Sequence, residues 1–177
     1  AERLPKHVPV SHGFTYSGHP AACAAAMANL DIIRADGLVT QANEVGAYLQ
    51  ERLRARLGDH ESVGEIRGLG LMAGIELVAD RSTKRGFSMP HSACTMVEHT
   101  AWDRWLYCRA MGIEVVGLAP PLSIDRACVD EMVDILVGSI ESMEAELLPA
   151  ERRRSERTGP RHESASAIFD AMGSRFD

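Results

Sequence analysis

The stretch from Ala21 to Ala35 constrains the fold of this chain more than any other. It is rich in alanine, a strong helix former, and it is apolar on nearly every face of a helix. A helix of this kind is buried all round, whereas a helix at the edge of a small free-standing domain carries a polar stripe. We therefore expect a helix over residues 21–35 that Asp36-Gly37 interrupts, and further protein packed against it.

A polar run from His12 to Pro20 precedes this helix. Three hydroxyl side chains lie in it between two glycines and two histidines. Glycine lets the backbone bend close to a ligand, hydroxyl groups hydrogen-bond anionic oxygens, and Pro20 fits the first turn of a helix. The run can therefore present hydroxyl and backbone N–H groups to a phosphate at a helix N-terminus. The alternative interpretation is a polar turn ahead of a buried helix.

The pattern of the following residues predicts an α+β domain, in which a short antiparallel sheet is packed with helices. Apolar residues recur at helical spacing over residues 38–57, and Gly58 is a stop signal. Further expected elements are strands at 63–67, 71–78, 113–118 and 122–124, a polar loop at 80–90 and a helix at 91–111. In that helix we expect Trp102, Trp105 and Leu106 to supply much of the buried surface.

A last helix is expected after Asp125, which can cap it. Its buried face is marked by apolar residues at helical spacing, namely Val129, Met132, Leu136, Ile140, Met143 and Leu147. The character of the sequence changes at Pro149. Residues 151–163 are dominated by Arg, Glu and Ser and predict a disordered linker, while residues 165–176 can form a weak terminal helix.

Composition excludes several classes of protein. The 177 residues are 45% hydrophobic and 25% charged, as in an ordinary globular protein, and the net charge of −6 argues against nucleic-acid binding. No apolar run reaches the roughly 18 residues of a membrane span, so we expect no membrane segment. The four cysteines are scattered without CxxC spacing, which predicts reduced thiols and a cytoplasmic location.

Neither the histidines nor the glycines form a convincing ligand motif. His7, His12 and His19 lack the i, i+4 spacing and the neighbouring cysteines or carboxylates of a metal site, so no metal ligand is predicted. The glycines of the segment 68–74 are spaced GxGxxxG, whereas a dinucleotide fingerprint is GxGxxG. Tight turning and close strand packing explain them better.

Three stretches resemble, in the same order, the class III aminotransferases, which are fold-type I enzymes that use pyridoxal 5′-phosphate. These stretches are HGFTYSGHPAACAAAMANLDII at 12–33, EIRGLGLMAGIEL at 65–77 and APPLSI at 119–124. The resemblance implies a homodimer whose subunits share the cofactor site, with an amine or amino-acid donor and a keto-acid acceptor.

The resemblance also implies a division of the chain into three parts. Residues 1–35 correspond to the end of the large domain, with the phosphate-contacting loop and a long interdomain helix. Residues 36–148 correspond to the small C-terminal domain. Residues 149–177 lie outside the resemblance, and we expect them to form a charged, disordered tail.

By resemblance, the functional residues are Thr15, Ser17, Gly18 and Arg109. The Thr15 hydroxyl is expected to donate to the cofactor phosphate of the neighbouring subunit, in a turn shaped by Ser17 and Gly18. Arg109 resembles the substrate-binding arginine of the ω-aminotransferases, because a guanidinium grips a carboxylate with two parallel bonds. The alternative for Arg109 is a surface arginine near a helix end. The family often has an acidic residue where this chain has Ile113, so the local alignment is open.

The family's catalytic lysine, which forms a Schiff base with the cofactor, has no counterpart in this sequence. The chain contains only Lys6 and Lys84, and neither stands at the family's position. No catalytic residue is therefore predicted, and the chain alone is expected to be inactive. Three interpretations stay open: the C-terminal part of an aminotransferase, a non-catalytic remnant that associates with a full-length relative, and a small anion-binding α+β domain.

Overall fold

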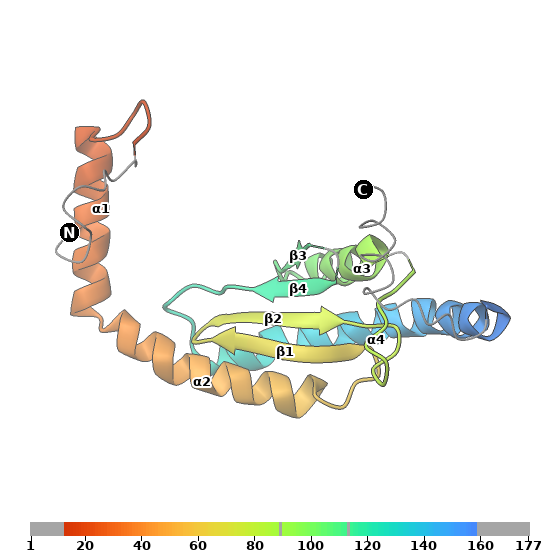
Figure 1. Cartoon of the computed structure of the whole chain (residues 1–177). Helices are drawn as coiled ribbons and strands as arrows, with labels where there is room; N and C mark the ends of the chain where they lie inside the picture. Colours follow the sequence, from red (N-terminus) through yellow and green to blue (C-terminus); the bar gives the residue numbers. More distant parts are fainter. Residues whose placement is uncertain (1–12, 89, 113, 159–177) are drawn as a thin grey trace, which may run out of the picture. The chain divides into compact units, whose positions relative to one another are not determined.

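A computed structural model of the protein describes residues 13–88, 90–112 and 114–158 (Figure 1). The chain divides into two compact units, Ala1–Thr40 and Gln41–Asp177. In chain order the elements are α1 (Pro20–Ala35), α2 (Leu38–Leu57), β1 (Val63–Leu69), β2 (Met72–Leu77), α3 (Pro90–Trp102), β3 (Arg109–Met111), β4 (Val115–Leu118) and α4 (Arg126–Thr158). In the part of the chain that the structure describes, no helix is both long enough and apolar enough to cross a membrane.

The first unit contains the predicted helix α1. Pro20 stands in its first turn, as expected, and the helix ends at Ala35, with Asp36 as its C-cap and Gly37 next at a φ of 62°. The apolar sequence predicts burial, yet none of the residues of α1 is buried. Its larger side chains, such as Met27, Leu30 and Ile32, are exposed. The first unit by itself therefore does not supply the cover that this sequence requires.

The second unit is built on a four-stranded antiparallel sheet with the order β1-β2-β4-β3. Because side chains alternate along a strand, one face of the sheet carries the buried residues. Ile75 of β2 pairs with Val116 of β4, and both are completely buried. The small antiparallel sheet and its helices confirm the predicted α+β fold.

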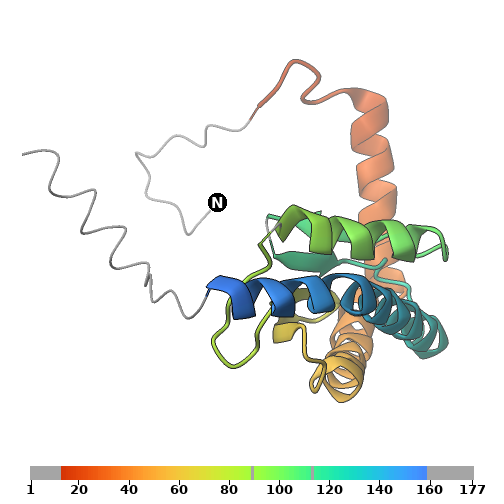
Figure 2. The ribbon, with the colours of Figure 1, turned by 90° about the vertical axis from the view of Figure 1, so that its right-hand side faces the viewer.

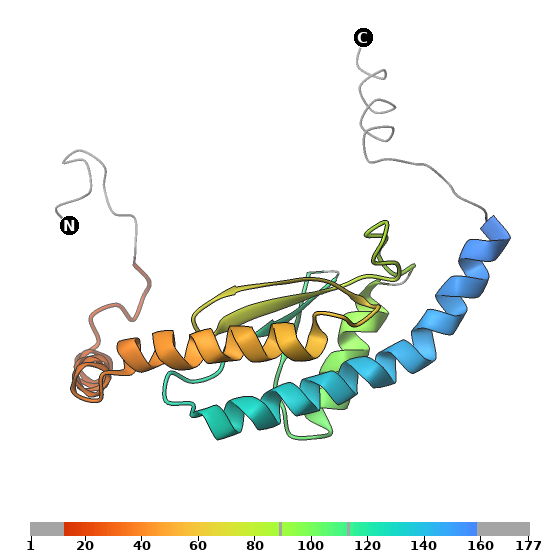
Figure 3. The ribbon, with the colours of Figure 1, turned by 90° about the horizontal axis from the view of Figure 1, so that it is seen from below.

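Helices α2, α3 and α4 supply the other half of the core. In the view from below, α2 and α4 run beside each other under the sheet (Figure 3), and hydrogen bonds from Tyr48 and Arg52 to Asp130 join them. The turned view shows α3 alongside α4 (Figure 2). Helices α2 and α4 both pack against the sheet. Their largest fully buried side chains are Leu49, Leu53 and Leu57 in α2 and Leu136, Ile140 and Met143 in α4.

Glycines allow α2 to lie directly on the hairpin between β1 and β2. Leu69 pairs with Met72, so Gly70 and Leu71 form a two-residue turn, and Gly70 has a φ of 56°. A glycine at the first turn position is typical of such hairpins. A Cβ atom at Gly46 of α2 would collide with the backbone of Gly70. The glycine-rich segment thus serves tight turning and close packing, as predicted.

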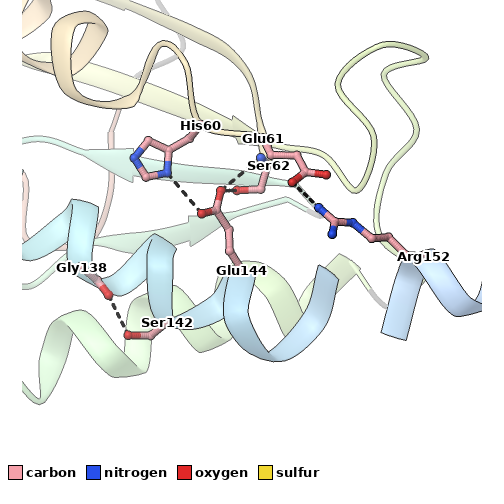
Figure 4. A network of polar contacts seen from close by, with 7 residues as sticks. All are labelled: His60, Glu61, Ser62, Gly138, Ser142, Glu144 and Arg152. Carbon is pink, nitrogen blue, oxygen red and sulfur yellow. Dashed lines mark hydrogen bonds and ion pairs between the residues drawn. The ribbon is translucent and has the colours of Figure 1, made fainter. Parts of the chain in front are cut away.

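A half-buried glutamate, Glu144, ties the connection between α2 and β1 to α4 (Figure 4). Glu144 Oε1 accepts hydrogen bonds from the Ser62 backbone N–H at 3.2 Å and from the Ser62 hydroxyl at 2.6 Å. Its Oε2 lies 3.3 Å from Nδ1 of His60. Nearby, Arg152 of α4 pairs with Glu61 of the same connection. These contacts fix the start of the sheet against the long helix.

The predicted helix at 91–111 is too long. Helix α3 ends at Trp102, and strand β3 occupies residues 109–111. The Leu106 N–H bonds to the Ala101 carbonyl and the Trp105 N–H to the Trp102 carbonyl, which is the Schellman pattern of helix termination. Trp105 holds the left-handed position with a φ of 67°, where a non-glycine residue costs about 1–2 kcal/mol.

The prediction that the two tryptophans are core residues is also wrong. Trp105 is 98% exposed and Trp102 is 61% exposed. Leu106 alone of the three packs against the core. The buried face of α3 consists instead of small side chains, namely Ala93, Cys94, Val97 and Ala101. Burial raises the pKa of the Cys94 thiol to about 11, as expected for a structural cysteine.

Two further predictions for the C-terminal half need correction. Residues 122–123 form a turn and residue 124 is irregular, so the predicted strand at 122–124 is not present. Asp125 caps α4 as predicted, since its Oδ1 accepts the Cys128 N–H at 2.8 Å. However, α4 continues through Pro149 to Thr158, so the disordered linker is wrong for residues 151–158, and the remaining tail lies outside the described residues.

Glu151 explains why the helix continues past the proline. Glu151 is 9% exposed, and its carboxylate accepts hydrogen bonds of 2.9 Å from Arg85 Nη1, the Ser88 N–H and the Ser88 hydroxyl. Burial alone would raise the pKa of Glu151, but these bonds outweigh burial and the pKa lies below its usual value. The loop at 80–88 thus anchors the end of α4, a contact that local composition does not reveal.

Candidate functional site

The predicted phosphate loop is a tight turn directly ahead of α1. The Ser17 N–H donates to the Phe14 carbonyl at 2.9 Å, and the Phe14 N–H donates to the Ser17 hydroxyl oxygen at 2.9 Å. Gly18 has a φ of 78°, a conformation that favours glycine. Ser17 and Gly18 therefore shape the turn. The Thr15 hydroxyl forms no hydrogen bond with any described residue and is exposed, so it is available to a ligand.

The N-terminus of α1 beside this turn has no side-chain cap. His19 occupies the cap position without making a cap hydrogen bond, and the first turn contains no acidic residue. The Cys23 N–H bonds to the His19 carbonyl, while the N–H groups of Ala21 and Ala22 precede the first intrahelical bond. Unused N–H donors and the positive end of the helix dipole favour an anion. The turn and the helix end together fit a phosphate group.

Arg109 begins the edge strand β3. Its neighbour Ala110 packs against the core, so Arg109 and Met111 point to the opposite, open face of the sheet. The Met111 side chain lies over Gly117, where a Cβ atom would collide with its sulfur. Arg109 is exposed and forms no ion pair with the residues described.

A second arginine lies in the same row of the sheet. Arg67 pairs with Gly74, Gly74 with Gly117, and Gly117 with Arg109, so the two arginines flank two glycines on one face. Arg67 is already neutralised, because it donates to Glu76 at 2.6 Å and to Glu65 at 3.0 Å. The bond to Glu76 raises the pKa of Arg67 above its usual value. In this row Arg109 is therefore the guanidinium that an incoming carboxylate can use.

The predicted site residues fall in different units of the structure. Thr15, Ser17 and Gly18 belong to the first unit, and Arg109 belongs to the second. Lys84 lies in the exposed loop between β2 and α3, at a φ of 54°, and Lys6 lies outside the described residues. Of the three histidines considered as metal ligands, His19 lies in the described residues and is exposed. The described ranges contain no group of side chains that could together hold a metal ion.

Sequence reasoning missed a polar and aromatic cluster in the second unit, formed by Arg104, Trp105 and Tyr107. It lies where α3 ends, next to the loop that follows β4. The sequence pattern predicts a helix over 91–111, which includes this segment, and therefore predicts Trp105 as a core residue. The sequence contains no signal for this helix end. Glycine usually marks the left-handed position after a helix, but here Trp105 occupies it.

Comparisons with known proteins show to which family the chain belongs. The model of the family described as Aminotransferase class-III matches residues 2–140. The diaminobutyrate–2-oxoglutarate transaminase of Halomonas elongata is 44% identical over 126 residues, which are 71% of this chain and 27% of that protein. The putrescine–pyruvate aminotransferase of Pseudomonas aeruginosa is 36% identical, over 77% of this chain and 30% of that protein.

A solved structure agrees as well. The ω-transaminase from Pseudomonas jessenii in complex with PMP superposes with a TM-score of 0.73 at 36% identity, covering 78% of this chain and 30% of that one. This chain belongs to the class-III aminotransferase family, and it spans about 30% of the length of these relatives. The family is in general pyridoxal-phosphate dependent and works between an amino donor and a keto-acid acceptor.

Proposed function

We propose that this chain supplies ligand contacts of a pyridoxal-phosphate-dependent transaminase. That enzyme transfers an amino group from an amine or an ω-amino acid to a keto acid such as pyruvate. The observation that carries the proposal is the exposed Thr15 turn beside the uncapped N-terminus of α1. In a chain of this family, such a cluster of unused donors is best explained as a phosphate site.

Thr15 is the residue that contacts the phosphate in this proposal. Its hydroxyl donates to a phosphate oxygen, while Ser17 and Gly18 hold the turn in place and the N-terminal dipole of α1 adds attraction. When bound, pyridoxal phosphate supplies an electron sink for the carbon that carries the amino group. We further propose a homodimer in which the turn serves the cofactor of the neighbouring subunit.

Arg109 orients the acceptor. Its planar guanidinium forms two parallel hydrogen bonds with a substrate carboxylate, and its lack of an ion pair with described residues leaves it free to do so. Neither Lys6 nor Lys84 stands where the family has its catalytic lysine, so these 177 residues do not turn over substrate alone. The free, scattered cysteines accord with a cytoplasmic location.

The test is a chimera in which this chain replaces the matching C-terminal segment of the putrescine–pyruvate aminotransferase. Thr15→Ala should weaken the cofactor roughly ten- to a hundredfold, because one hydrogen bond to a charged group is worth about 1.5–3 kcal/mol. Substrate choice should stay the same. Thr40→Ala, at an exposed threonine of α2, is the matched control.

Arg109→Ala in the same chimera should have the opposite profile. Cofactor affinity should be unchanged, while turnover of pyruvate falls far more than turnover of a neutral aldehyde acceptor. Arg109→Lys should recover only part, because a point charge does not reproduce the planar fork. Arg54→Ala, at an exposed arginine of α2, controls for the loss of a positive charge. Equal losses with acid and aldehyde would contradict the proposed role of Arg109.

A further inference from the structure

Strand β1 forms one edge of the sheet, on the side opposite β3 (Figure 1). It pairs with β2 along one side only. Within the described ranges, no hydrogen bond reaches the backbone of residues 64–69 from outside the β1–β2 hairpin. Because the N–H and carbonyl groups of a strand point to both of its sides, the outer side of β1 is a row of unpaired backbone donors and acceptors.

Gly68 shows that the backbone of this edge is accessible. A glycine consists of backbone atoms alone, and Gly68 is exposed. Its exposure does not come from space left by the missing side chain, because the amide of Gln50 occupies the position where a Cβ atom would stand. The neighbouring side chains of Arg67 and Leu69, on the open face of the sheet, are exposed as well.

Strand β1 also lacks most of the features that keep a sheet edge from pairing with another chain. Such features are short length, proline, lysine and bulges. The other edge strand, β3, is only three residues long. Strand β1 is seven residues long and contains neither proline nor lysine. Its single irregularity lies at its start, between Val63 and Glu65, and residues 65–69 pair regularly with β2.

The sequence of β1, VGEIRGL, is complementary to itself in an antiparallel arrangement centred on Ile66. Each residue then faces one of matching chemistry, in the pairs Glu65–Arg67, Gly64–Gly68 and Val63–Leu69. Opposite charges that face each other across two strands stabilise a sheet, and like charges destabilise it. The side chains of Glu65 and Arg67 are about half exposed, so both can reach a second strand.

Symmetry restricts the ways in which two copies of this edge can pair. A twofold axis perpendicular to the sheet keeps the two open faces on the same side, so facing residues belong to the same face and the axis passes through a residue position. An axis at Glu65 would bring two copies of that glutamate together, and an axis at Arg67 would bring two arginines together. The axis at Ile66 is the central position that brings opposite charges together.

We propose that β1 is an interaction surface for a second copy of this chain, and that the two β1 edges join into one continuous antiparallel sheet with Ile66 on the twofold axis. The contact uses β1 of both copies, so it closes at a dimer. It is separate from the proposed dimer that shares the cofactor, because it involves neither the Thr15 turn nor Arg109. It does not depend on the proposed transaminase function.

Analytical ultracentrifugation of the purified 177-residue chain over a range of concentrations tests the proposal. We expect a reversible equilibrium between monomer and dimer. Leu69→Lys should weaken the dimer at least about fivefold, because lysine in an edge strand opposes pairing. Met72→Lys is the matched control, since Met72 pairs with Leu69 and is also exposed but lies on β2. A chain that stays monomeric, or equal effects of the two variants, would overturn the proposal.

Charge reversal tests the register. Glu65→Arg and Arg67→Glu each bring like charges together twice in the dimer, so each variant alone should dimerise at least about fivefold more weakly than the wild type. A one-to-one mixture of the two variants should recover the affinity of the wild type, because opposite charges face each other again in the mixed dimer. Self-association that ignores both variants, or a mixture without recovery, would show that the copies meet at another surface.

The double variant Glu65→Arg/Arg67→Glu separates pairing from folding. It exchanges the two charges, so its own dimer should be as strong as that of the wild type. It also keeps a positive charge next to Glu76, because Glu65 pairs with Glu76 across the hairpin. Circular dichroism checks that every variant is folded. A folded double variant that dimerises as weakly as the single variants would contradict the axis at Ile66.

Discussion

Helices α1 and α2 follow each other directly in the chain but relate to the fold in opposite ways. In α2, charged residues separate an apolar stripe whose members Val45, Leu49, Leu53 and Leu57 are buried. In α1 no residue is buried, although its sequence is the more apolar of the two. Amphipathic α2 is therefore matched to the sheet of its own unit, whereas α1 presents apolar surface on several sides.

This difference shows which part of the chain buries enough of its own apolar surface to stabilise its fold. Burial of apolar surface is the main favourable term in folding, and the second unit obtains it from its own helices and sheet. Within its own unit, helix α1 buries little apolar surface, so we expect its contribution to stability to be small. The predicted ligand turn directly precedes α1. We therefore expect substitutions at Thr15 to have little effect on the free energy of unfolding.

The largest expected effect tests this contrast with one substitution in each helix. Leu53→Ala removes a side chain that is 0% exposed and should lower the free energy of unfolding by about 2–5 kcal/mol. Leu30→Ala removes the same atoms from a side chain that is 44% exposed and should change it by less than about 0.5 kcal/mol. Urea unfolding followed by circular dichroism measures both. A similar loss in both variants would mean that α1 is covered.

The second expected effect concerns the end of α4. Glu151→Gln removes a buried charge that holds Arg85 and Ser88, and should cost about 1–3 kcal/mol at neutral pH. The pKa of Glu151 is lowered in the folded state, so its contribution is present above the unfolded value near 4.5 and is lost as the pH falls through the folded value. The difference in the free energy of unfolding between the wild type and Glu151→Gln should therefore become smaller as the pH falls.

Urea unfolding at a series of pH values checks this prediction. Glu156→Gln, on the same helix but exposed and without an ion pair in the described ranges, serves as the control and should show no gap at any pH. A gap for Glu151→Gln that persists in acid would show that the helix end is held by packing, such as that of Leu148, instead of by charge.

Local pattern predicted most of the fold, and the errors have a common physical origin. Periodicity found α1, α2, both strands of the first hairpin and the capped start of α4. It failed where an element ends without the usual glycine, as at Trp105, and where a distant residue stabilises a helix, as Arg85 does for Glu151. Tertiary contacts decide both cases, and they are not visible in a local window.

The candidate site was predictable only in part. The Thr15 turn follows from a motif, whereas the sequence pattern predicts Arg109 within a helix and the structure places it on strand β3. The contrast between Arg67 and Arg109 required the register of the strands. The cluster near Arg104 had no sequence signal, since it lies where α4 meets two connecting segments that are apart in the chain.

The smallest expected effects concern the ligand residues themselves. Thr15→Ala and Arg109→Ala should each change the free energy of unfolding by less than about 0.5 kcal/mol, because both side chains are exposed and neither bonds to a described residue. Arg67→Ala breaks two surface ion pairs and should cost about 0.2–1 kcal/mol. Thermal unfolding of the three variants in low salt ranks their losses of stability. A loss in Arg109→Ala that exceeds the loss in Arg67→Ala would mean that Arg109 supports the sheet, and its assignment to substrate would lose its basis in an unpaired guanidinium.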